Sequence, residues 1–168
     1  MAEGQSTRGP GNAGSLRNIY LLSALIGLAS VALRVYLGIG TLATVIGWLL
    51  FAALLVLIVV GVVQVTRAGG RAPLRVSLVG VIYGVVTGAG DIVVPISAST
   101  LRAALEKEAQ RLPALTQALI EKAVQREMTL GAHITAAIEA VVLFWLIALL
   151  AAWIVSLFVK RPGSSSSV

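Results

Sequence analysis

Residues 41–65 read TLATVIGWLLFAALLVLIVVGVVQV and contain no charged side chain. A helix needs about 20 consecutive apolar residues to cross the hydrocarbon layer of a bilayer. This run is long enough, and its apolar residues form a block instead of recurring at the spacing of an amphipathic helix or strand. The run therefore predicts a transmembrane helix.

The composition of the whole chain points to the same solvent. Of its 168 residues, 58% are hydrophobic and 12% are charged, whereas soluble proteins are about half apolar and about a quarter charged. Three further blocks, at 19–37, 76–97 and 136–159, are also long enough to span a bilayer. We therefore predict one all-α integral membrane domain, a four-helix transmembrane bundle in contact with the lipid bilayer.

The first two blocks are joined only by Gly38, Ile39 and Gly40, and so short a link makes them an antiparallel helical hairpin. The polar segments 1–18 and 160–168 are predicted to be disordered tails. A cleaved signal peptide is an alternative interpretation of the first block. The long tail before it and Arg34 at its end favour a helix that remains.

The third block, 76–97, is the least certain span because it contains several glycines, Asp91 and Pro95. The alternative is a re-entrant segment, which leaves three spans and places 66–135 on the cytoplasmic side. Its apolar length favours a crossing helix.

Gly80, Gly84 and Gly88 recur every four residues in this block and form two overlapping GxxxG motifs. Such a face lets another helix approach closely, so we predict a helix-packing face. A second hypothesis is that residues 87–91 interrupt the helix and expose carbonyls and the Asp91 carboxylate at membrane depth, as in transporters.

An amphipathic segment precedes the last span and is predicted to form two helices, at 99–111 and 113–130. Ser99 or Thr100 is the expected cap of the first helix, and Pro113 separates the two. Basic and acidic residues nearly balance in it, so charge alone does not hold it on an anionic membrane. It either lies on the bilayer or the spans, or binds a partner.

The link between the second and third blocks carries Arg67, Arg71 and Arg75 and no acid. By the positive-inside rule this link is cytoplasmic, which also places the N-terminus in the cytoplasm. With four spans, the amphipathic segment then lies on the outer side of the membrane. The richness of the chain in Gly, Ala, Val and Arg and its short loops are typical of bacterial proteins, so we expect a bacterial plasma membrane.

In this arrangement Arg34, Asp91 and Glu139 lie at one level near the outer leaflet. Charges within hydrocarbon are costly and tend to pair inside a bundle, so we predict a polar site with Arg34 and Asp91 as the pair. Alternatively, Arg34 and Glu139 extend into the headgroups and only Asp91 needs a partner.

Several classes of function are disfavoured. The chain has no Cys, which excludes disulfides, thiolate chemistry and iron–sulfur clusters. It carries no catalytic motif, and His133 is expected to be a polar anchor, so we predict no enzyme, no cofactor and no metal. The net charge of +6 is expected near lipid headgroups and not on nucleic acid. The prediction is an accessory or structural subunit that forms a homo-oligomer or joins a larger membrane complex. The alternative is a small oligomeric transporter or channel with Asp91 in its pathway.

Overall fold

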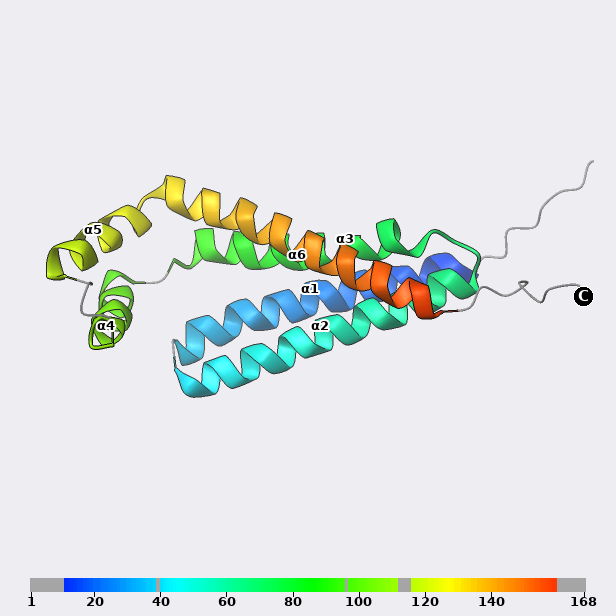
Figure 1. Ribbon diagram of the computed structural model, residues 1–168, viewed down its shortest axis with the longest axis horizontal. Helices are drawn as coiled ribbons and strands as arrows, with labels where there is room; N and C mark the ends of the chain where they lie inside the picture. The colour runs from blue at the N-terminus through cyan, green and yellow to red at the C-terminus, as the bar shows by residue number, and fades with distance from the viewer. Residues whose placement is uncertain (1–10, 39, 96, 112–115, 160–168) are drawn as a thin grey trace, which may run out of the picture.

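The computed structural model describes residues 11–38, 40–95, 97–111 and 116–159, with side chains from residue 16 onward. This part of the chain consists of helices joined by short links (Figure 1). In chain order they are α1 (Gly11–Leu37), α2 (Thr41–Arg67), α3 (Ala72–Val93), α4 (Ala98–Ala109), α5 (Gln117–Glu127) and α6 (Leu130–Phe158).

Four of these helices, α1, α2, α3 and α6, are long and apolar enough to cross a membrane. The prediction of an all-helical membrane bundle is confirmed at this level. The hypothesis of an interruption at residues 87–91 is wrong, because α3 continues through Asp91 to Val93. Thr87 lies inside that helix and donates its hydroxyl to the Tyr83 carbonyl at 3.0 Å, a bond that helical Thr commonly makes.

The four long helices lie side by side (Figure 1). The α1–α2 hairpin is antiparallel, α3 runs in the same direction as α1, and α6 returns alongside α3. The link 68–71 and the C-terminal end of α6 therefore lie at one end of the bundle. The α1–α2 link and the two short helices lie at the other.

Three of the four long helices, α1, α3 and α6, begin earlier than the sequence predicts. α1 includes residues 11–18, which were expected in a disordered tail, because Leu16 packs on the core and Ile19 is buried in it. Residues 1–10 and 160–168 lie outside the described residues. α3 begins at Ala72 because Pro73 is favoured in a first helical turn, where its missing N–H costs nothing.

The end of α3 is also displaced from the predicted boundary. The helix stops at Val93, and Val94 leaves the helical conformation with φ −127° and ψ 74°. The cause is Pro95, whose ring disfavours helical backbone at the residue before it.

Hydroxyl caps set the starts of α4, α5 and α6. Ser97, and not Ser99 or Thr100, caps α4, accepting from the Thr100 N–H at 3.2 Å. Thr116 caps α5, so that helix begins later than predicted, while Pro113 lies outside the described residues. Thr129 accepts from the Ala132 N–H at 3.2 Å and starts α6 at Leu130, well before residue 136. Each cap satisfies a backbone donor that has no partner within the helix.

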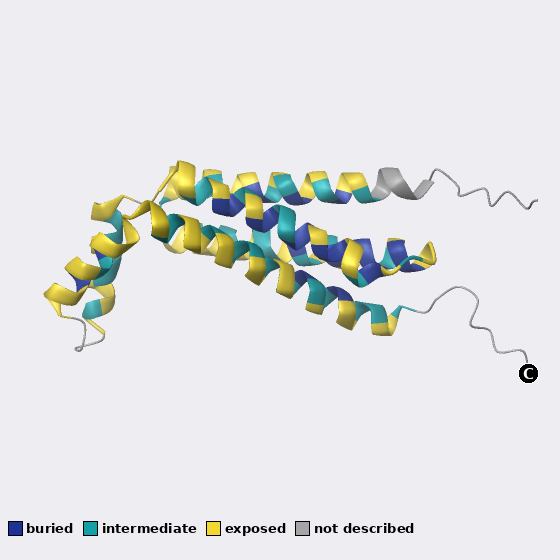
Figure 2. Cartoon of the chain, turned by 90° about the horizontal axis from the view of Figure 1, so that it is seen from above, coloured by how far each residue is buried: buried dark blue, intermediate teal, exposed yellow. Residues whose placement is uncertain are grey.

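The core lies where α1, α2, α3 and α6 meet, and Ile58, Val62, Val76 and Val79 have no exposed surface. Outside this core, the outward faces of the long helices are exposed (Figure 2). Large apolar side chains on all four helices are among the exposed residues. Water-soluble proteins do not expose apolar surface on this scale. The outward faces are suited to contact with lipid.

The α3–α6 pair forms the most extensive interface of the bundle. A Cβ atom on Gly84 would lie 2.7 Å from the Val141 Cα, and one on Gly88 would lie 3.0 Å from the Ala137 Cα. A Cβ atom on Gly80 would overlap the backbone of Phe144. The three glycines therefore lie directly against the backbone of α6, a helix that the sequence analysis did not identify as their partner.

Candidate intramembrane polar site

Arg34 of α1 and Asp91 of α3 form an ion pair, Nη1 to Oδ1, at the end of the bundle nearest α4. The side chains are 42% and 29% exposed, respectively. The pair is therefore reachable from one side and is not sealed in the core. It joins residues far apart in sequence and ties the end of α1 to the end of α3.

Small residues bring these two helices close enough for the pair to form. A Cβ atom on Gly90 would overlap the side chain of Val31, and one on Gly27 would lie 3.0 Å from Val86. Asp91 directly follows Gly90, so the close approach at this point places its carboxylate within reach of Arg34. Gly90 thus positions the ion pair by permitting helix contact.

Hydroxyl groups continue the α1–α3 contact toward the other end of the bundle. Tyr20 donates to the Arg75 carbonyl at 2.8 Å, and Ser23 donates to the Val79 carbonyl at 2.7 Å. Hydrogen bonds between transmembrane helices contribute about 0.6 kcal/mol on average and up to about 2 kcal/mol.

One further hydroxyl contact lies nearer the ion pair. Ser30 donates to the Ile26 carbonyl of its own helix at 2.9 Å, so its 3.1 Å contact with Tyr83 is a bond that Tyr83 donates. Ser23, Ser30 and Tyr83 are all buried. Sequence reasoning missed these residues, although Ser23, Gly27 and Ser30 show the three- and four-residue spacing that marks one helix face.

The ion pair lines a cavity of about 240 Å³ between the ends of α1 and α3. Ser97 and Thr100 lie on the same cavity wall and add hydroxyl groups. A guanidinium carries five N–H donors, and the ion pair uses one Arg34 nitrogen, Nη1. The cavity therefore offers a polar surface for binding.

Glu139 does not join the pair. It is exposed on α6, and the ion pairs among the described residues are Arg34–Asp91 and Arg102–Glu121. Ala137 and Val141 face α3, and a residue midway between them along a helix points away from that neighbour. His133 is half-buried in the first turn of α6. Within the described ranges no three metal-binding side chains come together.

No protein family, no curated protein and no solved structure matches this chain. The site must therefore be interpreted from its own geometry.

The α4–α5 hairpin lies beside the polar site and forms a small unit of its own. Arg102 donates from Nη2 to both carboxylate oxygens of Glu121, at 2.7 and 2.8 Å. Ile120 and Val124 are buried but lie outside the main core. Neither helix packs closely against α1, α2 or α3. The hairpin is thus held together by its own contacts and connected to the bundle through its ends.

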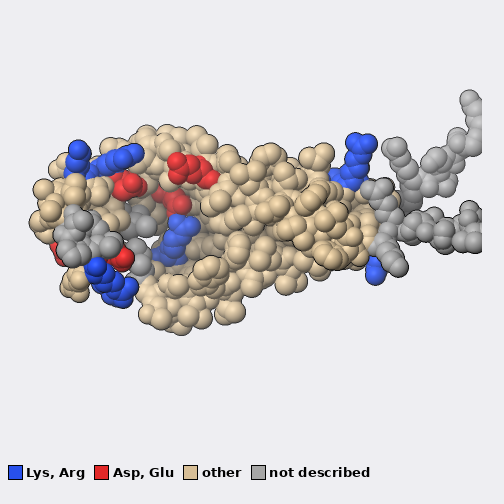
Figure 3. All heavy atoms as spheres, in the orientation of Figure 1, with Lys and Arg blue, Asp and Glu red and all other residues tan. Residues whose placement is uncertain are grey.

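Charge is distributed unequally over the surface. Charged side chains of both signs gather at the α4–α5 end, and an uncharged belt separates them from basic side chains at the other end (Figure 3). At that other end the described charged residues are all arginines, namely Arg17, Arg67, Arg71 and Arg75. An uncharged belt of this kind is suited to the hydrocarbon layer of a bilayer.

Proposed function

We propose that this membrane protein is an accessory subunit of a plasma-membrane complex, in which four spans display the α4–α5 hairpin on the outer surface for docking to a partner subunit. The observation that carries the proposal is the hairpin itself. It is charged, it contains an internal ion pair, and it does not pack on α1, α2 or α3. A helical pair held away from its own bundle keeps its outer faces free for another protein.

The arginines support the proposed orientation. Arg67, Arg71 and Arg75 flank the link between α2 and α3 without any acidic residue nearby. Arginine is retained on the cytoplasmic side. This supports a cytoplasmic N-terminus and an external hairpin.

Transport is the second candidate, and the cavity beside Asp91 is the observation that favours it. The interior below that cavity argues against a pathway through one copy of the chain. Ser23, Ile58 and Val76 are completely or almost completely buried there and fill the space between the helices. A conduit therefore requires an oligomer, whereas docking requires only one copy.

Photo-crosslinking in intact cells tests the docking proposal. A benzophenone amino acid at Gln125, exposed on α5, is expected to give discrete adducts larger than the 17.4 kDa chain. The matched control replaces Leu150, which is 58% exposed on the apolar face of α6 and is expected to react with lipid.

The adduct mass identifies the kind of complex. An adduct of twice the chain mass would show a homo-oligomer, and another mass would show a different subunit. Protein adducts from position 150 with none from position 125 would overturn the docking proposal, because the partner would then bind the spans.

A further inference from the structure

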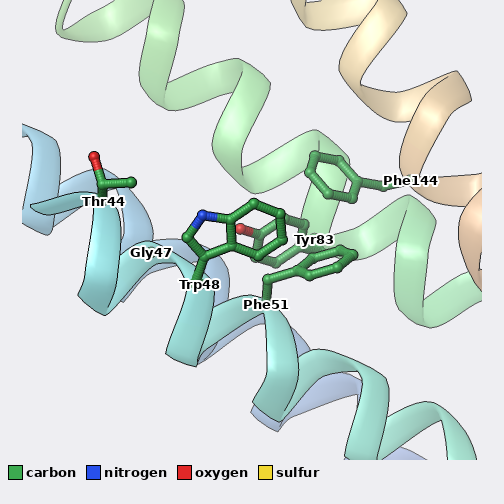
Figure 4. Close-up of a pocket in the computed structure, with 6 residues that line it drawn as sticks. All are labelled: Thr44, Gly47, Trp48, Phe51, Tyr83 and Phe144. Atoms are coloured by element: carbon green, nitrogen blue, oxygen red, sulfur yellow. The ribbon is translucent and has the colours of Figure 1, made fainter.

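Three neighbouring cavities, which share lining residues, lie between the lipid-facing side of the bundle and the polar site. The first, here called the aromatic groove, has a volume of about 340 Å³ and is lined by Thr44, Gly47, Trp48, Phe51, Tyr83 and Phe144 (Figure 4). The second, the polar chamber, has about 860 Å³ and lies between the start of α2 and α4. Thr44 lines both, and Thr100 lines both the chamber and the Arg34–Asp91 cavity.

The aromatic groove is apolar and open to the side. Trp48 and Phe51 extend from α2 toward Tyr83 of α3 and Phe144 of α6 (Figure 4). Tyr83 and Phe144 pack edge to face with ring centroids 4.6 Å apart and form its far wall. Trp48 is 68% exposed, and a Cβ atom on Gly47 would meet no atom within 4 Å. The groove therefore has room for a flexible hydrocarbon chain from the bilayer.

The polar chamber has a different chemistry. Its walls carry the hydroxyl groups of Thr41 and Thr44 from α2 and those of Ser99 and Thr100 from α4. Lys107 and Arg111 also line it, and their spacing of four places both on one face of the helix.

Glu108 is the acidic residue among the lining side chains, so the chamber has an excess of one positive charge. Thr41 begins α2, which places the chamber at the level where the apolar span ends. Lipid headgroups lie at this level.

We propose that the aromatic groove and the polar chamber together bind one anionic phospholipid. Its acyl chain occupies the groove, and its phosphate lies in the chamber near Lys107 and Arg111. The order of surfaces matches such a molecule, because the apolar groove and the hydroxyl-lined, positively charged chamber are neighbours that share Thr44. Lysine and arginine are the side chains that bind phosphate through charge-assisted hydrogen bonds.

The proposal predicts saturable, headgroup-selective binding. The full-length protein is placed in phosphatidylcholine vesicles containing a small amount of phosphatidylglycerol with a photoreactive diazirine on its acyl chain. Labelling is expected to concentrate on peptides from the groove walls in α2, α3 and α6. Excess unlabelled phosphatidylglycerol is expected to abolish it, whereas inorganic phosphate and additional phosphatidylcholine are not.

The most specific test is a variant whose added side chain fills the groove. Gly47→Leu places a side chain in the open space and is expected to reduce specific labelling by about tenfold or more, since overpacking a filled site costs more than 1 kcal/mol. Ala52→Leu enlarges an exposed residue of the same helix outside the lining and should label like the parent.

A second pair of variants tests the headgroup. Lys107→Gln with Arg111→Gln is expected to reduce the preference for phosphatidylglycerol over phosphatidylcholine by about thirtyfold, because each of the two basic residues contributes roughly 1 kcal/mol near a lipid surface. Lys122→Gln with Arg126→Gln removes the same charge from α5, outside the chamber, and should change the preference little.

Labelling spread evenly over the outward faces, or unchanged by Gly47→Leu in a protein of unchanged melting temperature, would overturn the proposal. A preference equally sensitive to both pairs of charge variants would show general surface attraction and would overturn the headgroup assignment. If Gly47→Leu lowers the melting temperature, competition in the parent protein decides, because groove labelling that excess unlabelled phosphatidylglycerol does not displace would also overturn the proposal.

Discussion

Replacing Gly80 with leucine is expected to eliminate most of the folded protein. Its Cβ atom would occupy the position of the Phe144 backbone, and backbone cannot rotate aside as a side chain can. Overpacking typically costs about 1–3 kcal/mol and occasionally more. Here the obstacle is main chain at the most extensive interface, so we expect the upper end of that range or beyond. Size-exclusion chromatography in mild detergent measures the loss as aggregated protein.

Gly131→Leu is the matched control for this substitution. Gly131 lies in the first turn of α6, and a Cβ atom there would meet no atom within 4 Å. The variant should elute and melt like the parent protein. Equal behaviour of the Gly80 and Gly131 variants would contradict the close α3–α6 contact.

The second large effect is expected at the Arg34–Asp91 pair. Removing one partner of a fully buried pair costs about 3–5 kcal/mol. With side chains 42% and 29% exposed, we discount this to about 1–2 kcal/mol for Arg34→Gln or Asp91→Asn. Thermal unfolding in detergent should show a lower melting temperature for each single variant.

The reversed pair, Arg34→Asp with Asp91→Arg, provides the decisive comparison. If the two residues stabilise the protein through each other, the double variant should recover more than half of the summed loss of its single variants, Arg34→Asp and Asp91→Arg. The double-mutant cycle of these variants measures the coupling energy. Additive losses would show that the residues act separately. An Asp91→Asn protein of normal abundance and melting temperature that has lost flux across the membrane would favour the transport candidate.

The strongest sequence signals predicted the architecture well. The uncharged run 41–65 and the three other apolar blocks correspond to α2, α1, α3 and α6, because lipid exposure requires nearly continuous apolar sequence. Helix ends were predicted less well. Leu16 packs on the core, and the polar residues next to it are therefore part of α1. The capping role of Thr129 becomes evident only from its hydrogen bond with the Ala132 N–H.

The ion pair was predictable for a different reason. An arginine and an aspartate near the same end of two apolar helices have few partners other than each other. The positions of their neighbours were not predictable, because a sequence gives no information on how far each helix is rotated about its axis. That rotation turns Ala137 and Val141 toward α3 and leaves Glu139 exposed. It also turns Ser23 and Ser30 toward α3, where their hydroxyl groups find partners.

Cysteine accessibility in intact cells tests most directly whether α3 crosses the membrane and separates the α2–α3 link from the α4–α5 hairpin. The chain contains no native cysteine, so a thiol reagent can label only the cysteine introduced at Ala68 or Gln125, both of which are exposed. An impermeant maleimide should label Gln125→Cys in intact cells and Ala68→Cys only after permeabilisation. The converse pattern would retain four spans and reverse the orientation. The same accessibility at both positions, whether labelled or protected, would place the link and the hairpin on one side and contradict a membrane-crossing α3.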